Sequence, residues 1–137
     1  MRRIAVFVAM ALSLVGTAYA QTGGQFCVQA FEDRNANGQQ DAGEPVLTRG
    51  VSMNLLNEQG IIIQSAMLEN SPRASFGEYC FQLLPAGQYS VVVTSADYRA
   101  TTPDTIAAAI SESGTPALAQ FGGQRVPPAL RPHRRWW

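Results

Sequence analysis

The chain has 137 residues, and its ten basic residues, all of them arginine, balance ten acidic residues. The absence of lysine excludes a Schiff-base mechanism, a Walker-type phosphate loop and a Lys–Asn isopeptide crosslink, because each of these needs that side chain. The charge balance gives no indication of nucleic-acid binding.

Residues 1–20 have the features of a secretory signal peptide. Arg2 and Arg3 precede the apolar run "IAVFVAMALSLVG", and "AYA" has the small-residue pattern of a cleavage site that ends at Ala20. The alternative is an uncleaved membrane anchor, although the run is short for a bilayer span. Cleavage leaves residues 21–25 as a linker to one exported domain, with no further transmembrane segment expected.

Between residues 25 and 122, short apolar stretches are separated by turn residues, as in an all-β protein. "IAAAI" (106–110) is compatible with a strand or with one turn of helix, and the break after it favours a strand that pairs with "ALAQF" (117–121). The spacing predicts a single antiparallel β-sandwich of about seven strands over residues 26–122. The other predicted strands lie near 26–31, 51–56, 61–67, 78–84 and 89–93.

The chain has two cysteines, Cys27 and Cys80. In an exported chain, oxidation to a disulfide is favoured, and we expect these two residues to pair. The alternative is two free, buried thiols. A metal site through these thiols is not expected, because no nearby histidine or third cysteine completes one.

Residues 33–44, "DRNANGQQDAGE", fill every slot of the D-x-[DN]-x-[DN]-G-x5-E calcium loop. Gly38 at the sixth position permits the sharp turn, and oxygen donors at the other positions suit Ca²⁺. The alternative is a solvated polar turn, since turns favour Asp, Asn and Gly. The predicted ligands are Asp33, Asn35, Asn37, the backbone carbonyl of Gln39, Asp41 and Glu44.

The segments that flank this loop read as strands rather than as the helices of an EF-hand. Bound calcium would therefore hold a long acidic connection between two strands and act as a structural ion. Three carboxylates in an extracellular setting indicate weak binding, with a dissociation constant on the order of 10⁻⁴–10⁻³ M.

Two blocks of sequence, "FEDRNANGQQDAGEPVLTRGVSMNLLNEQG" and "GEYCFQLLPAGQYSVVV", resemble the B-type repeat domain of serine-aspartate-repeat surface adhesins. More broadly, the chain is similar to the prealbumin-like (Ig-like) collagen-adhesin B-type sandwiches, over roughly residues 26–122. The matching positions are Phe31, Glu32, the loop 33–44, Leu47, Gly50, Val51, Gly77, Tyr79, Phe81, Leu84, Pro85, Gly87, Tyr89 and "QFG" at 120–122.

The resemblance implies a calcium-stabilised sandwich that serves as a spacer, stalk or interaction module outside the cell, and it implies no catalysis. The chain departs from the family in three respects. It carries one unit rather than a run of repeats, its cysteine pair is not part of the pattern, and it has no sorting motif.

An enzyme is not expected, because the only histidine, His133, lies in the C-terminal tail, and a Ser-His-Asp or Cys-His site would therefore need a disordered base. A carboxylate pair for glycoside hydrolysis is a weaker alternative, since the clustered acids already have a metal role. Tyr79, Phe81 and Tyr89 match either core packing or a sugar-binding platform, and their alternation favours core packing.

The tail, residues 123–137, is rich in Gly, Pro and Arg and poor in aliphatic residues, so disorder is expected. Its last residues combine positive charge with two tryptophans, which suits docking on an anionic membrane surface or in a partner's groove. The alternative is a solvated end. The candidate docking residues are Arg131, Arg134, Arg135, Trp136 and Trp137.

The sequence therefore predicts a secreted or cell-surface, calcium-stabilised β-sandwich that acts as a structural or protein-interaction module. An accessory subunit of a larger surface assembly, with a protein partner in the envelope or outside the cell, fits this description. The alternative is a carbohydrate- or ligand-binding module that uses an exposed face of the sandwich.

Overall fold

The computed structural model describes residues 23–128. The expected signal peptide (1–20) and the candidate docking residues lie outside this range. The latter are Arg131, Arg134, Arg135, Trp136 and Trp137. Within 23–128 there is no helix of the length and apolarity that crossing a membrane requires.

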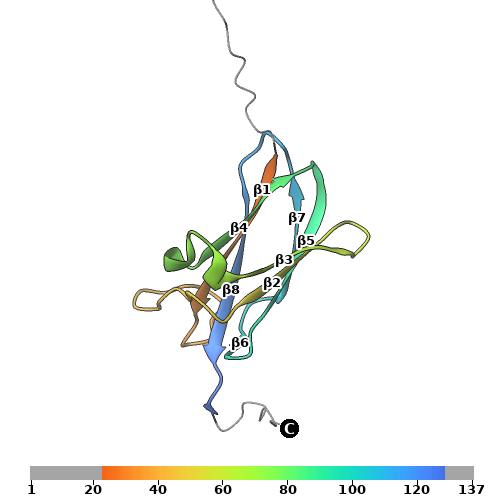
Figure 1. The fold of residues 1–137 in the computed structure, drawn as a ribbon. Helices are drawn as coiled ribbons and strands as arrows, with labels where there is room; N and C mark the ends of the chain where they lie inside the picture. Colours follow the sequence, from red (N-terminus) through yellow and green to blue (C-terminus); the bar gives the residue numbers. More distant parts are fainter. Residues whose placement is uncertain (1–22, 129–137) are drawn as a thin grey trace, which may run out of the picture.

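The described chain forms two four-stranded sheets that pack face to face, which confirms the all-β sandwich (Figure 1). One sheet, sheet A, has the order β4-β1-β8-β6, and the other, sheet B, has the order β3-β2-β5-β7. The strands are β1 (Gly24–Glu32), β2 (Ser52–Leu56), β3 (Ile62–Met67), β4 (Glu78–Leu84), β5 (Gly87–Thr94), β6 (Tyr98–Ala100), β7 (Thr105–Ile110) and β8 (Ala117–Arg125). Two single-turn 3₁₀ helices, η1 (Leu68–Asn70) and η2 (Ala74–Phe76), lie between β3 and β4.

The core fills the space between the sheets with apolar side chains that alternate along the strands. In β2 and β5 the buried residues are two apart, because successive side chains of a strand point to opposite faces. The largest fully buried side chains are Phe26, Phe31, Phe81, Phe121, Met53, Leu55, Leu68 and Leu84. Phe81 and Tyr89 thus belong to the core, as their alternation predicts.

The pairing of the last strands differs from the prediction. β7 pairs with β5 in sheet B and not with the "ALAQF" segment, which lies in β8. β8 instead runs parallel to β1 in sheet A, and it extends to Arg125. The connection between β7 and β8 therefore crosses from one sheet to the other, which a Gly–Pro break alone does not reveal.

A bulge in β4 changes which leucine is buried. Leu83 adopts φ +57° and is 56% exposed, whereas Phe81 and Leu84 are both buried. The register of β4 against β1 shifts at this point, as expected where one strand holds an extra residue. Just after it, the Tyr89 hydroxyl donates a hydrogen bond of 2.8 Å to the Pro85 carbonyl and fixes the turn into β5.

Gly77 is a position at which the fold requires glycine. It has φ +68°, and a Cβ there would lie 2.6 Å from the Ala30 carbonyl oxygen and 2.7 Å from the Val46 Cβ. We expect Gly77→Ala to destabilise the domain by about 3 kcal/mol, because strain in the left-handed region adds to a backbone clash. Gly60→Ala is the matched control, since Gly60 has φ +76° but no atom within 4 Å of an added Cβ.

Urea unfolding of the two variants separates the cost of the left-handed backbone from the cost of the clash. The control should lose only about 1 kcal/mol, the cost of the left-handed backbone. Equal losses of unfolding free energy in both variants would show that the close approach of Gly77 to Ala30 does not add to the destabilisation.

Candidate metal centre

The acidic loop 33–44 is the connection that leaves β1, and backbone hydrogen bonds close its base. The Glu32 N–H donates to the Pro45 carbonyl at 2.8 Å, and the Leu47 N–H donates to the Ala30 carbonyl at 2.9 Å. Phe31 and Val46 form an isolated antiparallel bridge between these two bonds. The loop is thus held as a long hairpin at the end of β1 and needs no flanking helices.

Asp33 is the first predicted ligand and the only buried charged residue of the described chain, with 0% of its surface exposed. Its Oδ2 accepts hydrogen bonds from the Gly38 N–H at 2.7 Å and from the Thr101 hydroxyl at 2.6 Å. Its Oδ1 accepts from the Asn37 N–H at 3.2 Å. This carboxylate therefore ties the loop to the connection between β6 and β7.

The ionisation of Asp33 is linked to folding. Burial by itself raises the pKa of the Asp33 carboxyl, but hydrogen bonds from the Thr101 hydroxyl and from three backbone N–H groups of the loop lower it below its ordinary value of 3.8. Because the folded-state pKa lies below the unfolded one, the stability from this group is present above pH 3.8. It is lost as the pH falls through the lower folded-state value.

Three further predicted ligands converge on one another. Asn35 Nδ2 donates to Asp41 Oδ2 at 2.8 Å, and Asn37 Nδ2 donates to the same oxygen at 2.6 Å. The Oδ1 atoms of the two asparagines accept backbone N–H groups two residues further on. Gly38, with φ +79°, makes the turn that brings these side chains to one side of the loop.

Glu44, the last predicted ligand, folds back over the start of the loop. Its Oε1 accepts from the Arg34 N–H at 2.8 Å, and its Oε2 accepts from the Asp41 N–H at 2.9 Å. Gln39 contributes a backbone carbonyl at the seventh position of the pattern, and its own N–H is bonded to Asn37. All six predicted positions thus belong to one compact loop.

The donor set fits Ca²⁺, because it consists entirely of carboxylate, amide and carbonyl oxygens. The three carboxylates nevertheless do not converge within a metal's first shell here. Among residues 23–128, the one group of three acidic or sulfur side chains with ligand atoms within 4.8 Å is Cys27, Glu78 and Cys80. Its two sulfurs are bonded to each other, so that group is not a metal site.

Thr101 is a residue that sequence reasoning missed. It lies 68 residues from Asp33, in a stretch with no motif, and only the fold brings them together. Gly122 completes this corner, because a Cβ there would lie 2.6 Å from Thr101 Oγ1 and 2.9 Å from the Phe31 ring. The "QFG" at 120–122 therefore has a packing role beside the loop.

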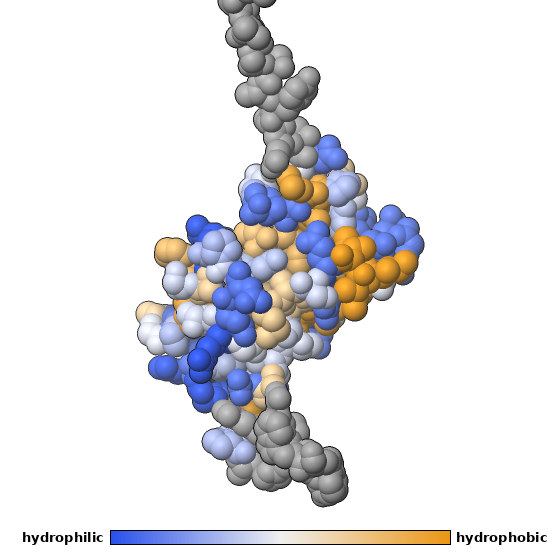
Figure 2. All heavy atoms as spheres, viewed as in Figure 1, coloured by the Kyte–Doolittle hydropathy of each residue, from blue (hydrophilic) through white to orange (hydrophobic). Residues whose placement is uncertain are grey.

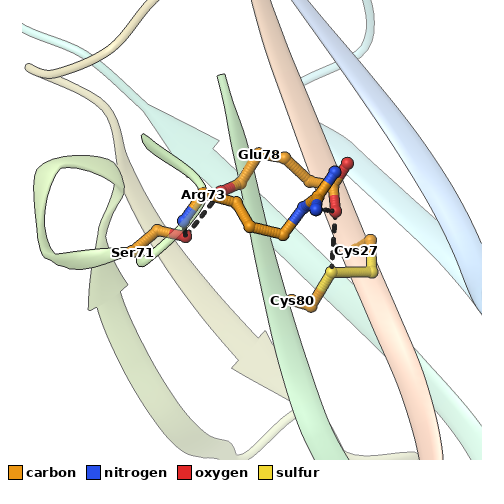
Figure 3. The surroundings of a disulfide bond; sticks show 5 residues. All are labelled: Cys27, Ser71, Arg73, Glu78 and Cys80. Atoms are coloured by element: carbon orange, nitrogen blue, oxygen red, sulfur yellow. Dashed lines mark hydrogen bonds and ion pairs between the residues drawn. A yellow bond between two sulfur atoms is a disulfide. The ribbon is translucent and has the colours of Figure 1, made fainter. Parts of the chain in front are cut away.

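The predicted pairing of Cys27 with Cys80 is confirmed. The disulfide joins directly opposed residues of β1 and β4, and Glu78 and Arg73 lie beside it (Figure 3). Glu78 Oε1 is 2.8 Å from Arg73 Nε and 3.3 Å from Cys80 Sγ. The Ser71 hydroxyl accepts from the Arg73 N–H and donates to the Glu78 carbonyl at 2.6 Å, so the segment with η2 is fixed to the start of β4.

A groove of about 750 Å³ opens next to the disulfide. Its lining combines amide side chains such as Gln25, Gln64 and Gln82 with the ion pair Arg73–Glu78. Tyr79 also borders it, with its ring 5.0 Å from that of buried Phe81 in an edge-to-face arrangement. With Phe81 and Tyr89 inside the core, the three aromatics do not form an exposed sugar-binding platform.

The fold and the loop define a β-sandwich of the type found in surface adhesins. A family model described as the SdrD B-like domain matches residues 24–120. The chain therefore belongs to the SdrD B-like domain family, as its motifs predict. None of the curated proteins compared with the chain matches it.

Solved structures with the same fold include pilin subunits. The minor pilin GBS52 of Streptococcus agalactiae is 17% identical with a TM-score of 0.53, and the match covers 82% of this chain and 49% of that one. BcpA*(D312A), the major pilin subunit of Bacillus cereus, is 15% identical with a TM-score of 0.52, over 76% and 30%.

The Bacillus anthracis TIE protein is 20% identical with a TM-score of 0.51, over 75% of this chain and 18% of that one. The chain thus spans half or less of the length of each of these three proteins. At these identities, the similarity shows the fold.

Proposed function

We propose that this protein is an exported structural module that a calcium ion stabilises, and that it serves as an accessory subunit of a larger surface assembly. The observation that carries the proposal is the buried Asp33 at the head of a complete calcium-loop pattern. Membership of the SdrD B-like family and the likeness in fold to pilin subunits support a non-enzymatic role outside the cell.

Calcium would supply positive charge at a point where three carboxylates belong to one short connection. Asp33, Asn35, Asn37, Asp41 and Glu44, with the Gln39 carbonyl, would hold the ion. Their attraction to the ion would join both ends of the loop, so that the loop and the Thr101 connection become one rigid corner of the sandwich. Such a site suits a compartment in which calcium is always plentiful.

Chelation tests the proposal. We expect the melting temperature to rise between calcium-free buffer and millimolar calcium, because an ion that binds only the folded state adds about 1.4 kcal/mol for each tenfold excess over its dissociation constant. For a domain of this size, that amounts to several degrees, on the order of 5 °C. Differential scanning calorimetry, with calcium binding followed by isothermal titration, measures both quantities.

Two variants make the test specific. Glu44→Ala should abolish the calcium response, because it removes the last predicted ligand. Glu58→Ala, which removes an exposed acid in the turn between β2 and β3, should leave the response intact. A melting temperature that ignores calcium in the unsubstituted protein would contradict the metal role, and an equal response in both variants would contradict the assignment of the loop.

A ligand-binding role is the second candidate, and the groove beside the disulfide favours it. Its amide-rich lining offers both donors and acceptors to a neutral polar ligand such as a saccharide. A glycan array with the unsubstituted protein and Gln82→Ala separates the two candidates. Binding that is lost in the variant supports a ligand site in the groove. An array without signal counts against ligand binding and favours the structural role.

A further inference from the structure

The outward face of sheet B carries no charged side chain. The register places Asn54 opposite Val92, and Val92 opposite Thr105, so these three side chains point away from the core on one face. The side chains on this face, called the uncharged face, are Ser52, Asn54, Leu56, Ile62, Ser65, Met67, Gln88, Ser90, Val92, Thr94, Thr105, Ala107 and Ala109. They are all exposed or half-buried.

The polar groups of this face are partly satisfied within it. The Ser65 hydroxyl donates to Asn54 Oδ1 at 2.6 Å, and the Ser52 hydroxyl lies 2.9 Å from Met67 Sδ. The other polar side chains of the face, such as Gln88, Ser90 and Thr94, are neutral, so covering the face with another protein surface buries no charge. The cost of removing water from it is therefore lower than for a charged face, because isolated charges are by far the most expensive groups to bury.

One edge of the uncharged face is strongly apolar. Ile61, Ile62 and Ile63 are 59%, 55% and 44% exposed, and they form the patch beside the hairpin between β2 and β3 (Figure 2). They lie on or next to β3, one of the two edge strands of sheet B, which pairs with β2 alone. An apolar edge strand without a charged residue from 61 to 67 is a feature of protein-interaction sites.

Charged residues surround the uncharged face in the connections. Glu58 follows β2, Asp104 precedes β7 and Glu112 follows β7, and all three are exposed. The centre of the face therefore favours a neutral partner surface. These three acids form an acidic rim, and any effect of salt on binding would come from this rim.

The size of the face is close to the lower limit for a specific interface. Four strands at a spacing of about 4.8 Å span roughly 19 Å, and strands of about six residues are roughly 20 Å long. The projected area is thus about 400 Å² per copy. Projecting side chains and the isoleucine edge add to this flat area. The total area that two copies bury together therefore approaches the roughly 1,000 Å² at which specific interfaces begin.

We propose that two copies of this chain associate through their uncharged faces in a two-fold symmetric dimer. A second copy matches the face because it presents an equally uncharged surface, so no charge is buried without a partner. A symmetric pairing of one patch with itself is the usual form of a dimer. The modest area predicts weak association, with a dissociation constant on the order of 10 µM.

Analytical ultracentrifugation of the chain from Gln21 to Trp137, between about 1 and 500 µM, tests the proposal. We expect a monomer–dimer equilibrium that strengthens when NaCl is raised from about 0.05 M to 0.5 M. Salt screens the repulsion between the two acidic rims, and it leaves the neutral centre unaffected. An association held by ion pairs would instead weaken.

Two substitutions place a charge in the face without altering the core. Ala107→Glu on β7 and Ser65→Glu on β3 are both at exposed positions. Each should weaken the dimer at least tenfold. Gln120→Glu, an exposed position on the outer face of sheet A, is the matched control and should leave the dimer unchanged. Circular dichroism melting curves confirm that each variant is folded.

Three results would overturn the proposal: a monomer at every concentration, a dimer that both face variants retain, and a dimer that Gln120→Glu weakens as much as they do. A chain that is monomeric alone and binds only a different protein counts against it in the same way. Since the test does not involve the calcium loop, its outcome is independent of the metal role.

Discussion

Replacement of Cys27 and Cys80 by alanine is expected to lower the free energy of unfolding by about 4 kcal/mol, the largest effect we expect from any pair of substitutions. The disulfide joins residues 53 positions apart. In the chain-entropy model, a crosslink that closes a loop of this length removes conformational entropy from the unfolded state and raises its free energy by about that much. For a domain of this size the melting temperature should fall by roughly 20 °C.

Melting curves recorded with and without reductant supply the control. Reductant should destabilise the unsubstituted protein by a similar amount and leave the double variant unaffected, because the variant has no bond to reduce. Thiol titration of the unfolded, unreduced protein should find no free cysteine. A loss below about 1 kcal/mol in the variant would mean that the unfolded chain is already compact between the two residues.

The parts of the structure that could be predicted from the sequence are those set by local spacing. The ligand pattern of 33–44 depends on the dihedral angles of twelve consecutive residues, and Gly38 adopts the positive φ that the pattern requires. The alternation of apolar residues in β2 and β5 likewise predicts that one face of each strand is buried, and the structure confirms it. The cysteine pair was predictable for another reason, since two cysteines allow a single pairing, and the expected export of the chain favours its oxidation.

Other features depend on contacts between distant segments, for which a single sequence carries no local signal. "IAAAI" and "ALAQF" are near in sequence and similar in character, yet they belong to different sheets, because β7 completes sheet B and β8 fills the gap between β1 and β6. The exposure of Leu83 follows from a bulge that a period of two does not anticipate. The Thr101 hydroxyl reaches Asp33 only after all these strands have assembled.

β1 connects the stabilising devices of the fold. Near its start, Cys27 is joined to β4, and directly after its end, Asp33 is joined to the connection after β6. Along its length it pairs with β4 on one side and with β8 on the other. A central strand that is fixed near both ends resists separation of the sheet from the loops.

Asp33→Asn is expected to lower the melting temperature on the order of 10 °C and to remove the calcium response at the same time. The amide retains one acceptor oxygen, but its NH₂ group then faces the Gly38 N–H, which is itself a donor. A buried donor without an acceptor and the loss of the first predicted ligand both follow from one substitution. The corner between the loop and Thr101 should therefore loosen.

Thr101→Val separates the two roles of this carboxylate. It removes the hydroxyl that donates to Asp33 Oδ2 and leaves every predicted calcium ligand in place. We expect a lower melting temperature with the calcium response retained. Loss of the calcium response in Thr101→Val would place the Thr101 hydroxyl within the metal site. A calcium response that persists in Asp33→Asn would show that Asp33 is not a ligand.

Acid unfolding in calcium-free buffer gives an independent reading of the same group. Above about pH 5, the stability difference between the unsubstituted protein and Asp33→Asn should be constant, because the carboxylate is ionised in both the folded and the unfolded state. Below pH 3.8 this stability difference should narrow. In that range the carboxyl of Asp33 is protonated in the unfolded state but stays ionised in the folded state until the pH reaches its lower folded-state pKa. A difference that did not change with pH would show that the hydrogen bonds of Asp33 do not depend on its charge.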